Sequence, residues 1–174
     1  MHFVDEAGVC SDCHAGTTWA PVGVTPVVAT TGARHAVNLI SAVTAQGALR
    51  FSAFFGSFTG ATFVDFLKKL LADAPGPVFV VVDGHPAHRA TVVKEYVRST
   101  DGRLQLYFLP GCSPELNPDE WVWKNIKADR VGRAGITSQH EFHSKIAAAL
   151  HRLQKTPHLI CGFFTDPNLR YITA

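Results

Sequence analysis

The sequence lacks any apolar run long enough to cross a membrane, and its N-terminus lacks the pattern of a signal peptide. Charge of one sign is also scarce, because charged residues make up only 17% of the 174 residues and the net charge is +2. A protein that holds DNA unaided usually has a stronger basic excess. We therefore expect a cytoplasmic protein whose grip on any nucleic acid needs a local patch, a second copy or another segment.

Cysteine is nearly as scarce, with four in the chain. Cys10, Cys13 and His14 match the CxxCH pattern of haem attachment, and CxxC also begins many zinc sites. No export signal or evident axial ligand supports haem, and no second CxxC or HxxxH pair follows at a normal zinc spacing. We interpret these residues as a hairpin with reduced thiols, with haem and zinc as alternatives.

The length of 174 residues predicts a single domain, and the hydrophobic fraction of 47% predicts that it is globular. The first third of the chain has the residue pattern of extended strands. Residues 2–5 form a short strand that ends on Asp5, and Gln46–Gly47 gives a hairpin turn. The strands that we expect here cover residues 2–5, 17–19, 24–31, 36–44 and 49–55.

Helices and strands then alternate. Helical spacing of apolar residues predicts helices over 61–72 and 87–98. The uniformly apolar 78–82 predicts a buried strand, and 104–109 a further one. A capping box at Ser138–Glu141 begins a last helix, which stops before Pro157. This order predicts an α/β fold, a mixed sheet of an antiparallel meander and parallel strands flanked by helices.

The stretch LPGCSPELNPDEWVWKNIK, residues 109–127, has three prolines at four-residue spacing and then an abrupt helix. Asn117 suits the N-cap, Pro118 the first helical position and Glu120 the third. The loop therefore delivers a carboxylate at the head of a helix.

Three carboxylates can meet near this helix. Asp5 and Asp83 each follow an apolar strand, and strand ends are where ligands gather in such sheets. With Glu120 they form an oxygen-rich seat for Mg²⁺, and two such ions suit in-line displacement at a phosphodiester. Each residue also has a plainer interpretation: Asp5 as a turn residue, Asp83 as a helix cap, and Glu120 as the end of a capping box with Asn117.

Four motifs stand in order along the chain: FVDEAG, TTWAPVGVTP, VVVDGHPAH and LPGCSPELNPDEWVWKNIK. Together they resemble the DDE catalytic domain of mariner-like bacterial insertion-sequence transposases. The resemblance implies a ribonuclease-H-like domain over residues 1–155 with a C-terminal tail at 156–174. It also implies two Mg²⁺ or Mn²⁺ ions and an enzyme that cuts and rejoins DNA at transposon ends.

Matched by motif, the catalytic and metal-binding triad is Asp5, Asp83 and Glu120. Asp119 is the alternative third ligand, because relatives use Asp there; Glu120 is preferred because it aligns with the acidic residue after Asn-Pro-X. His88 matches a histidine of the family's second motif, so we expect it to contact DNA phosphate or to hold its loop, with a purely structural role as the alternative. Glu6 also matches a frequent family residue, whose role stays open.

The helix after Glu120 predicts a DNA contact independently of the resemblance. At about 100° per residue, Lys124 and Lys127 share the face of Glu120, whereas Val122, Trp123 and Ile126 face another side. Lysines beside a metal ligand suit DNA phosphates, although a solvated amphipathic helix would show the same pattern. Arg89, Lys94, Arg130 and Arg133 would extend this patch.

The resemblance implies DNA as the partner, both transposon ends and target, with a homodimer on the DNA and a location at the bacterial nucleoid. The family's N-terminal helix-turn-helix domain is absent here, so we expect an upstream polypeptide to recognise the ends. Two alternatives stay open: a truncated or domesticated domain that binds DNA or a partner without chemistry, and a related ribonuclease-H-like nuclease.

Overall fold

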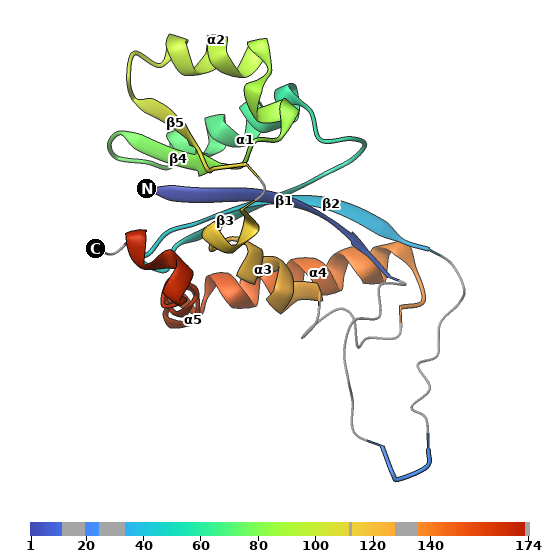
Figure 1. Cartoon of the computed structure of the whole chain (residues 1–174). Coiled ribbons are helices and arrows are strands. Elements are labelled where there is room, and N and C mark those ends of the chain that lie inside the picture. Colours follow the sequence, from blue (N-terminus) through green and yellow to red (C-terminus); the bar gives the residue numbers. More distant parts are fainter. Residues whose placement is uncertain (12–19, 25–33, 112, 128–135, 173–174) are drawn as a thin grey trace.

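The computed structural model describes residues 1–11, 20–24, 34–111, 113–127 and 136–172. Five strands form one mixed sheet in the order β3-β2-β1-β4-β5 (Figure 1). β1 pairs antiparallel with β2 and parallel with β4; β2 pairs antiparallel with β3, and β4 parallel with β5. The mixed sheet predicted from the sequence is confirmed. The strands are β1 (His2–Cys10), β2 (Ala36–Val43), β3 (Leu49–Phe54), β4 (Val78–Val82) and β5 (Leu104–Phe108).

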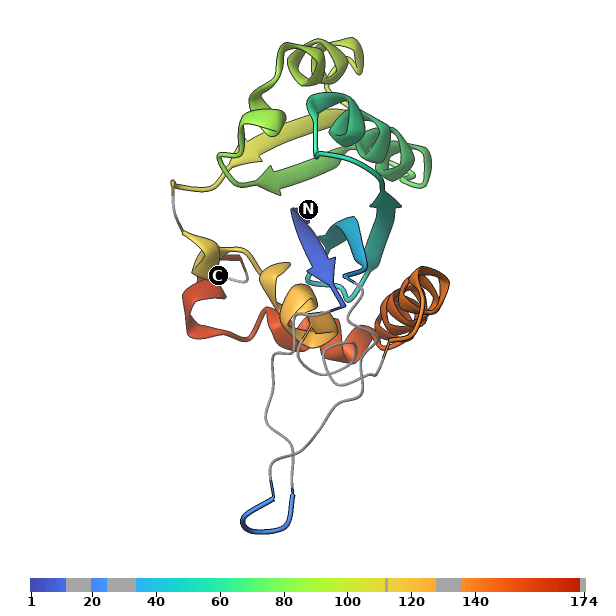
Figure 2. The same cartoon turned by 90° about the vertical axis from the view of Figure 1, so that its right-hand side faces the viewer.

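Helices cover both faces of the sheet. Helices α1 (Gly60–Ala72) and α2 (Thr91–Ser99) lie on one face, and α3 (Glu120–Lys124), α4 (Gln139–Gln154) and α5 (Pro157–Phe163) lie on the other (Figures 1 and 2). The short 3₁₀ turns are η1 (Pro86–Arg89), η2 (Pro114–Leu116) and η4 (Pro167–Ile172). None of the helices in the described ranges is long and apolar enough to cross a membrane.

Each face of the sheet has its own hydrophobic core, because successive side chains of a strand point to opposite faces. On β1, Phe3 packs into the core under α3, α4 and α5, and Val4 packs into the core under α1 and α2. Val80 and Val82 of β4 join the second core, whereas Val81 joins the first. The four valines of β4 are therefore buried, as predicted for a central strand, whereas Phe79 is 37% exposed, which the prediction of burial on both faces did not include.

The hairpin and the first helix agree with the sequence. Gly47 has a φ of 84°, the left-handed conformation that favours glycine, in the turn between β2 and β3. Helix α1 begins after Thr59, whose side chain accepts a hydrogen bond from the backbone N–H of Thr62. The two predicted segments at 17–19 and 24–31 lie wholly or almost wholly outside the described residues.

The single helix expected over 87–98 is wrong, because Ala90 interrupts it with an extended backbone (φ −59°, ψ 148°). The segment is instead η1 followed by α2. α1 packs closely here: a Cβ on Gly60 would lie 2.7 Å from the Cβ of Ala90. Gly60 thus permits the approach of α1 to the junction between η1 and α2.

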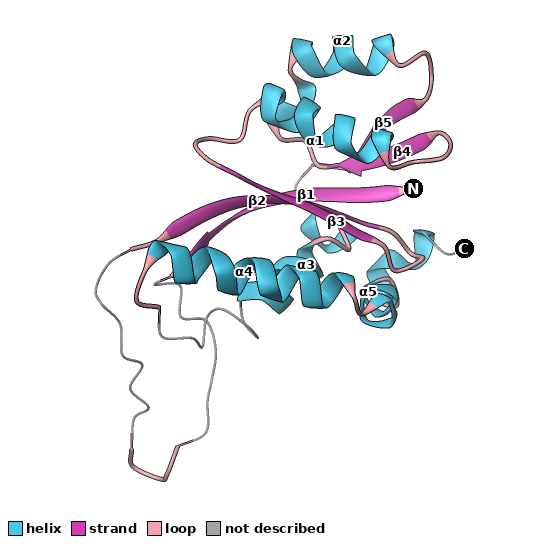
Figure 3. Cartoon of the chain, turned by 180° about the vertical axis from the view of Figure 1, so that it is seen from behind, coloured by secondary structure: helices cyan, strands magenta, loops and turns pink. Residues whose placement is uncertain are grey.

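The segment after residue 155 was expected as a tail, and it folds as α5 and η4. Figure 3 shows α5 beside the end of α4, on the α3 side of the sheet. Its apolar residues belong to the protein's cores: Ile160, Phe163, Phe164 and Leu169 are all buried. Tyr171 donates a 2.7 Å hydrogen bond from its hydroxyl to the carbonyl of Leu116. The end of the described chain is therefore tied to the loop before α3.

Candidate metal centre

Asp5 and Asp83 lie side by side although Asp5 does not end its strand. β1 continues to Cys10, so the prediction of a strand end at Asp5 is wrong. The parallel pairing of β1 with β4, however, stops at Phe3 and Val81. Asp5 and Asp83 each lie two residues beyond that last pair. β1 carries on because β2 pairs with it as far as Cys10, whereas β4 ends at Val82.

The proline-rich loop brings the third carboxylate to the same edge of the sheet. Asn117 Nδ2 donates to the carbonyl of Val4 at 3.4 Å, which ties the loop to β1 beside Asp5. Asn117 Oδ1 accepts from the backbone N–H of Asp119 at 3.1 Å. The expected N-cap is therefore displaced: Asp119 is the N-cap residue, and Glu120 is the first residue of α3. Glu120 is thus not the third residue of a capping box with Asn117.

Asp5, Asp83 and Glu120 line one cavity of about 360 Å³. Its remaining wall comes from Gly84 and from the loop that connects β5 with α3. Asp5 is 9% exposed, the side chain of Asp83 is 50% exposed, and Glu120 lies at the surface. The three carboxylates predicted from the sequence therefore share a hollow that is open to a substrate.

The electrostatics of the cavity show that these carboxylates affect one another. Burial raises the pKa of Asp5 to about 8, and the negative charges of Glu120, Glu6 and Asp83 contribute to the shift. Partial burial also raises the pKa of Glu120; the positive charge of Lys127 opposes that shift, and Asp83 and Glu6 add to it. A concentration of negative charge at this point is what a cation would neutralise.

Two buried rings contact the carboxylates of the triad: the indole of Trp123 contacts Asp5, and the imidazole of His88 contacts Asp83. Trp123 Nε1 donates a 2.9 Å hydrogen bond to Asp5 Oδ2. His88 Nδ1 lies 2.9 Å from Asp83 Oδ1, which also accepts from the backbone N–H of His85 at 2.9 Å. His88 is fully buried, and its Nε2 is 3.4 Å from Glu6 Oε2 without hydrogen-bond geometry. His88 was predicted to bind DNA, but its burial favours the alternative, that it holds its loop.

Asp119 faces away from the cavity into the protein. It is fully buried, and the hydroxyl of Ser41 donates to its two carboxylate oxygens at 3.0 and 2.8 Å. Ser41 is the cross-strand partner of Asp5 in the β1–β2 pair. Burial, together with the charge of Asp5, raises the pKa of Asp119 well above its ordinary value. This geometry supports Glu120 over Asp119 as the third ligand. No pattern in the sequence indicates that Ser41 would contact Asp119.

Lys124 of α3 and Lys127, three residues beyond the end of α3, lie near the cavity, as the helical spacing predicted. Lys127 is close enough to Glu120 to oppose its pKa shift, and Lys124 lines a neighbouring hollow together with Glu120. Val122, Trp123 and Ile126 are buried on the other side of the helix. Lys94 lies on α2, across the sheet from this patch, and Arg89 lies over the Phe108 ring at 4.2 Å. Arg130 and Arg133 are outside the described residues.

The donor set fits hard divalent cations, since carboxylate oxygens are the ligands that Mg²⁺ and Mn²⁺ prefer. Asp5, Asp83 and Glu120 converge on the cavity but do not form a closed ligand shell: across the described ranges, no three His, Cys, Asp or Glu side chains are gathered as a preformed metal cage. The thiol of Cys10 is free, whereas Cys13 and His14 lie outside the described residues.

The model of the family described as "DDE superfamily endonuclease" matches residues 1–143. The fold is similar to the catalytic domain of Mos1 mariner transposase, with a TM-score of 0.60, 12% identity, and coverage of 98% of this chain and 81% of that one. It is also similar to a pre-cleavage Mos1 transpososome (TM-score 0.64, 10% identity, 99% and 56% covered). A Mos1 paired-end complex with Mn gives a TM-score of 0.61 at 12% identity (99% and 55% covered).

This chain spans about half the length of the Mos1 chains in those complexes with DNA. At such low identity the likeness establishes the fold, which confirms the ribonuclease-H-like architecture predicted from the motifs. No curated protein sequence matches the chain.

Proposed function

Because this chain belongs to the DDE superfamily of endonucleases, we propose that it is the catalytic core of a DNA transposase that cleaves and rejoins phosphodiester bonds. The observation that carries the proposal is the cavity lined jointly by Asp5, Asp83 and Glu120. The three residues come from β1, from the loop after β4 and from the start of α3. These residues are far apart in sequence but converge in space. A catalytic site requires such convergence, whereas residues that merely cap separate elements have no reason to meet.

The triad would hold two Mg²⁺ or Mn²⁺ ions. When bound, such ions activate an attacking water or DNA 3′-hydroxyl and stabilise the leaving oxygen. The protein's own part is to fix the ligands. Trp123 orients Asp5, and His88 with the backbone of His85 orients Asp83.

Lys124 and Lys127 would bind DNA phosphates beside the carboxylates, because Lys124 lines a hollow with Glu120 and Lys127 lies close enough to Glu120 to lower its pKa. Phosphate contacts position a substrate without reading its sequence. The proposed partners are therefore transposon-end and target DNA, a second copy of the chain on the DNA, and a helix-turn-helix polypeptide that selects the ends.

The test is nicking of supercoiled DNA with Mn²⁺ and without it. We expect nicking by the wild type and none by Asp83→Ala, with Asp65→Asn as the matched control. Asp65 lies on the exposed side of α1, where it pairs with Lys68 at 3.3 Å. Equal nicking by the wild type and Asp83→Ala would contradict the enzyme proposal. It would leave a domain that binds DNA or a partner without chemistry.

Joining separates a transposase from a related nuclease. We expect a duplex with a free 3′-hydroxyl to become covalently joined to a second DNA in the presence of Mn²⁺. Hydrolysis without joined products would instead support a ribonuclease-H-like nuclease on the same metal site.

A further inference from the structure

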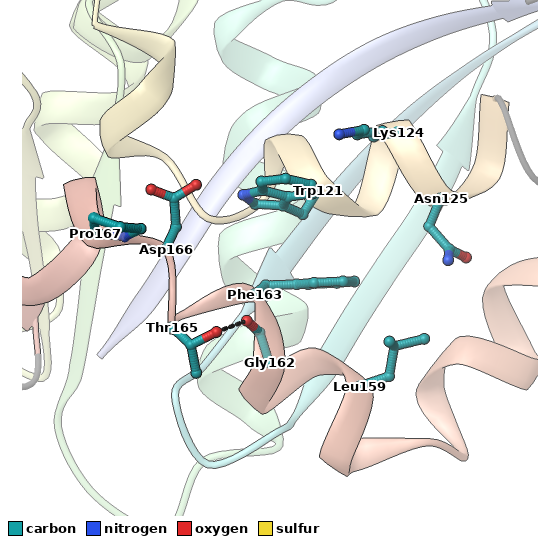
Figure 4. Close-up of a pocket in the computed structure, with 9 residues that line it drawn as sticks. All are labelled: Trp121, Lys124, Asn125, Leu159, Gly162, Phe163, Thr165, Asp166 and Pro167. Atoms are coloured by element: carbon teal, nitrogen blue, oxygen red, sulfur yellow. Dashed lines mark hydrogen bonds between the residues drawn. The ribbon is translucent and has the colours of Figure 1, made fainter.

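A pocket of about 550 Å³ lies between α3 and α5 (Figure 4). Trp121 of α3 and Phe163 of α5 present their rings on its two sides. Polar groups stand at its ends, with Lys124 and Asn125 at one and Asp166 at the other. Its lining is therefore mostly apolar, with a few polar groups at defined places, which is typical of a binding pocket for an organic molecule.

This pocket is linked to the candidate metal centre by a third hollow that adjoins both. A hollow of about 370 Å³ lies between the two and is lined by Pro114, Asn117 and Glu120, which also line the cavity of the triad. The same hollow is lined by Trp121, Lys124 and Asp166, which also line the pocket. The three adjoining hollows, together called the groove below, therefore follow α3 from the three carboxylates to the two aromatic rings.

The pocket's chemistry suits a flat aromatic ring more than a phosphate. Trp121 is half-buried, and Lys124 Nζ covers one face of its indole, 4.1 Å from the ring centroid, while the ring also lines the pocket together with Phe163. The Asp166 carboxylate, which accepts from the backbone N–H of Asn168 at 2.9 Å, would repel a phosphate. Asp166 and Asn125 can instead bond the donor and acceptor groups on the edge of a base.

We propose that this pocket binds one unstacked nucleobase of the DNA strand whose phosphate lies at Asp5, Asp83 and Glu120. The inference rests on the proposed function, because it takes the DNA strand to enter at the triad. A strand held there by its phosphate has its next bases within the groove, and the Lys124 ammonium remains near the backbone. Every base has an aromatic face, so stacking in the pocket does not require a particular sequence.

The proposal predicts that the chain prefers DNA with unpaired bases. A paired base must first leave its stack, which costs free energy, whereas an unpaired base enters the pocket without that cost. Loss of one base–aromatic stack typically weakens binding by about 5- to 150-fold. Trp121→Ala should therefore lower affinity for DNA with an unpaired extension by roughly tenfold and leave affinity for blunt duplex nearly unchanged.

The test uses a DNA hairpin with a three-nucleotide single-stranded extension and the same hairpin with a blunt end, in Ca²⁺ to prevent cleavage. Fluorescence anisotropy gives the two affinities. In a second arm, 5-iododeoxyuridine is placed at single positions and photocross-linked, and the linked peptide is identified by mass spectrometry. We expect cross-links to Trp121 or Phe163 from the extension and none from the duplex stem.

Two variants serve as controls. Trp121→Phe keeps an aromatic face and should keep the preference for the extension, which separates lost stacking from lost folding. Phe55→Ala removes an exposed aromatic residue just after β3, 87% exposed, and should change nothing. An undiminished preference in Trp121→Ala, or cross-links only outside α3 and α5, would overturn the pocket assignment. If Asp83-dependent nicking is retained in that case, the proposed function stands.

A protein segment as the occupant is the competing outcome. It would appear as no preference for the extension by the wild type, together with a Trp121→Ala variant that nicks DNA normally. That result also overturns the nucleobase assignment. Absence of nicking by the wild type would instead contradict the proposed function itself.

Discussion

Trp123 Nε1 donates a 2.9 Å hydrogen bond to Asp5 Oδ2, and this bond joins the buried side of α3 to the middle of β1. Trp123 is 3% exposed and packs in the core under α3, α4 and α5. The helix that carries Glu120 at its first residue thus also orients Asp5 through its fourth. One short helix therefore determines the positions of two of the three triad carboxylates.

Removing this bond should weaken metal binding. In Trp123→Phe the ring still fills the core, but Asp5 loses a donor that favours its ionised form, so the pKa of Asp5 should rise further. We expect the Mn²⁺ concentration for half-maximal nicking to rise by about 10- to 100-fold. Trp121→Phe makes the same chemical change on the same helix without touching this bond. Equal effects of the two substitutions would show that the Trp123–Asp5 bond is not responsible.

The pKa of Asp5 predicts how stability depends on pH without metal. Its value of about 8 in the folded protein is above the ordinary 3.8. The folded state therefore binds the proton on the Asp5 carboxyl more tightly than the unfolded state does. The stability that protonated Asp5 contributes is lost as the pH rises from about 4 to about 8. Asp5→Asn removes the loss, and should raise the free energy of unfolding at pH 8 by about 2 kcal/mol or more, with little change near pH 4.

Urea denaturation at pH 4, 6 and 8 in the presence of a chelator would measure this difference. Asp65→Asn, an exposed carboxylate on α1, should show no such trend. A gain from Asp5→Asn that is the same at every pH would mean that ionisation of Asp5 is not its cause.

The neighbours Asp119 and Glu120 should separate stability from catalysis. Asp119→Ala leaves the Ser41 hydroxyl without its buried acceptor, and we expect a loss of about 1–3 kcal/mol in the free energy of unfolding. Nicking should persist at temperatures where this variant stays folded. Glu120→Gln lies at the surface and should leave the unfolding midpoint nearly unchanged while it abolishes nicking. The reverse pattern would make Asp119 the metal ligand.

His88 should act on the reaction through Asp83. His88→Ala removes the 2.9 Å contact with Asp83 and the packing against Phe63, whose ring centroid is 4.5 Å away. We expect the apparent Mn²⁺ affinity to fall by about 10- to 100-fold. His85→Ala is the matched comparison, since its ring lies 3.9 Å from Glu6 and its backbone bond to Asp83 survives. A larger effect in His85→Ala would contradict the role of His88.

Much of the fold could be predicted because the sheet's strands and its hairpin have strong local patterns. The apolar β4 and the Gln46–Gly47 turn depend on residues close in sequence. The extension of β1 past Asp5 could not be seen, since it depends on pairing with β2, about thirty residues away along the chain. The break at Ala90 could not be predicted for a related reason. It lies where Gly60 of α1 packs closely, and the local spacing of apolar residues carries no information about that distant contact.

The meeting of Asp5, Asp83 and Glu120 in one cavity was expected from the motifs, whereas the side chains that contact these carboxylates were not. Trp123 was expected only to pack inward, and nothing local links it to Asp5, 118 residues away. Ser41 is one hydroxyl in an apolar strand, and its function depends entirely on the cross-strand register that places it opposite Asp5. Side chains that support a site are harder to predict from sequence than those that react, because several residue types of suitable shape can occupy a supporting position.

The position of the third carboxylate also determines when the site can first exist. β1 and β4 precede α3 in the chain, so their pairing can bring Asp5 and Asp83 together before that helix has been made. Glu120 and Trp123 arrive only with α3, and the core beneath that helix still requires α4 and α5. Because N-terminal parts of a chain fold first, a nascent chain holds at most two of the three carboxylates in place. The three carboxylates can thus come together only after α3 and the helices that pack with it have formed.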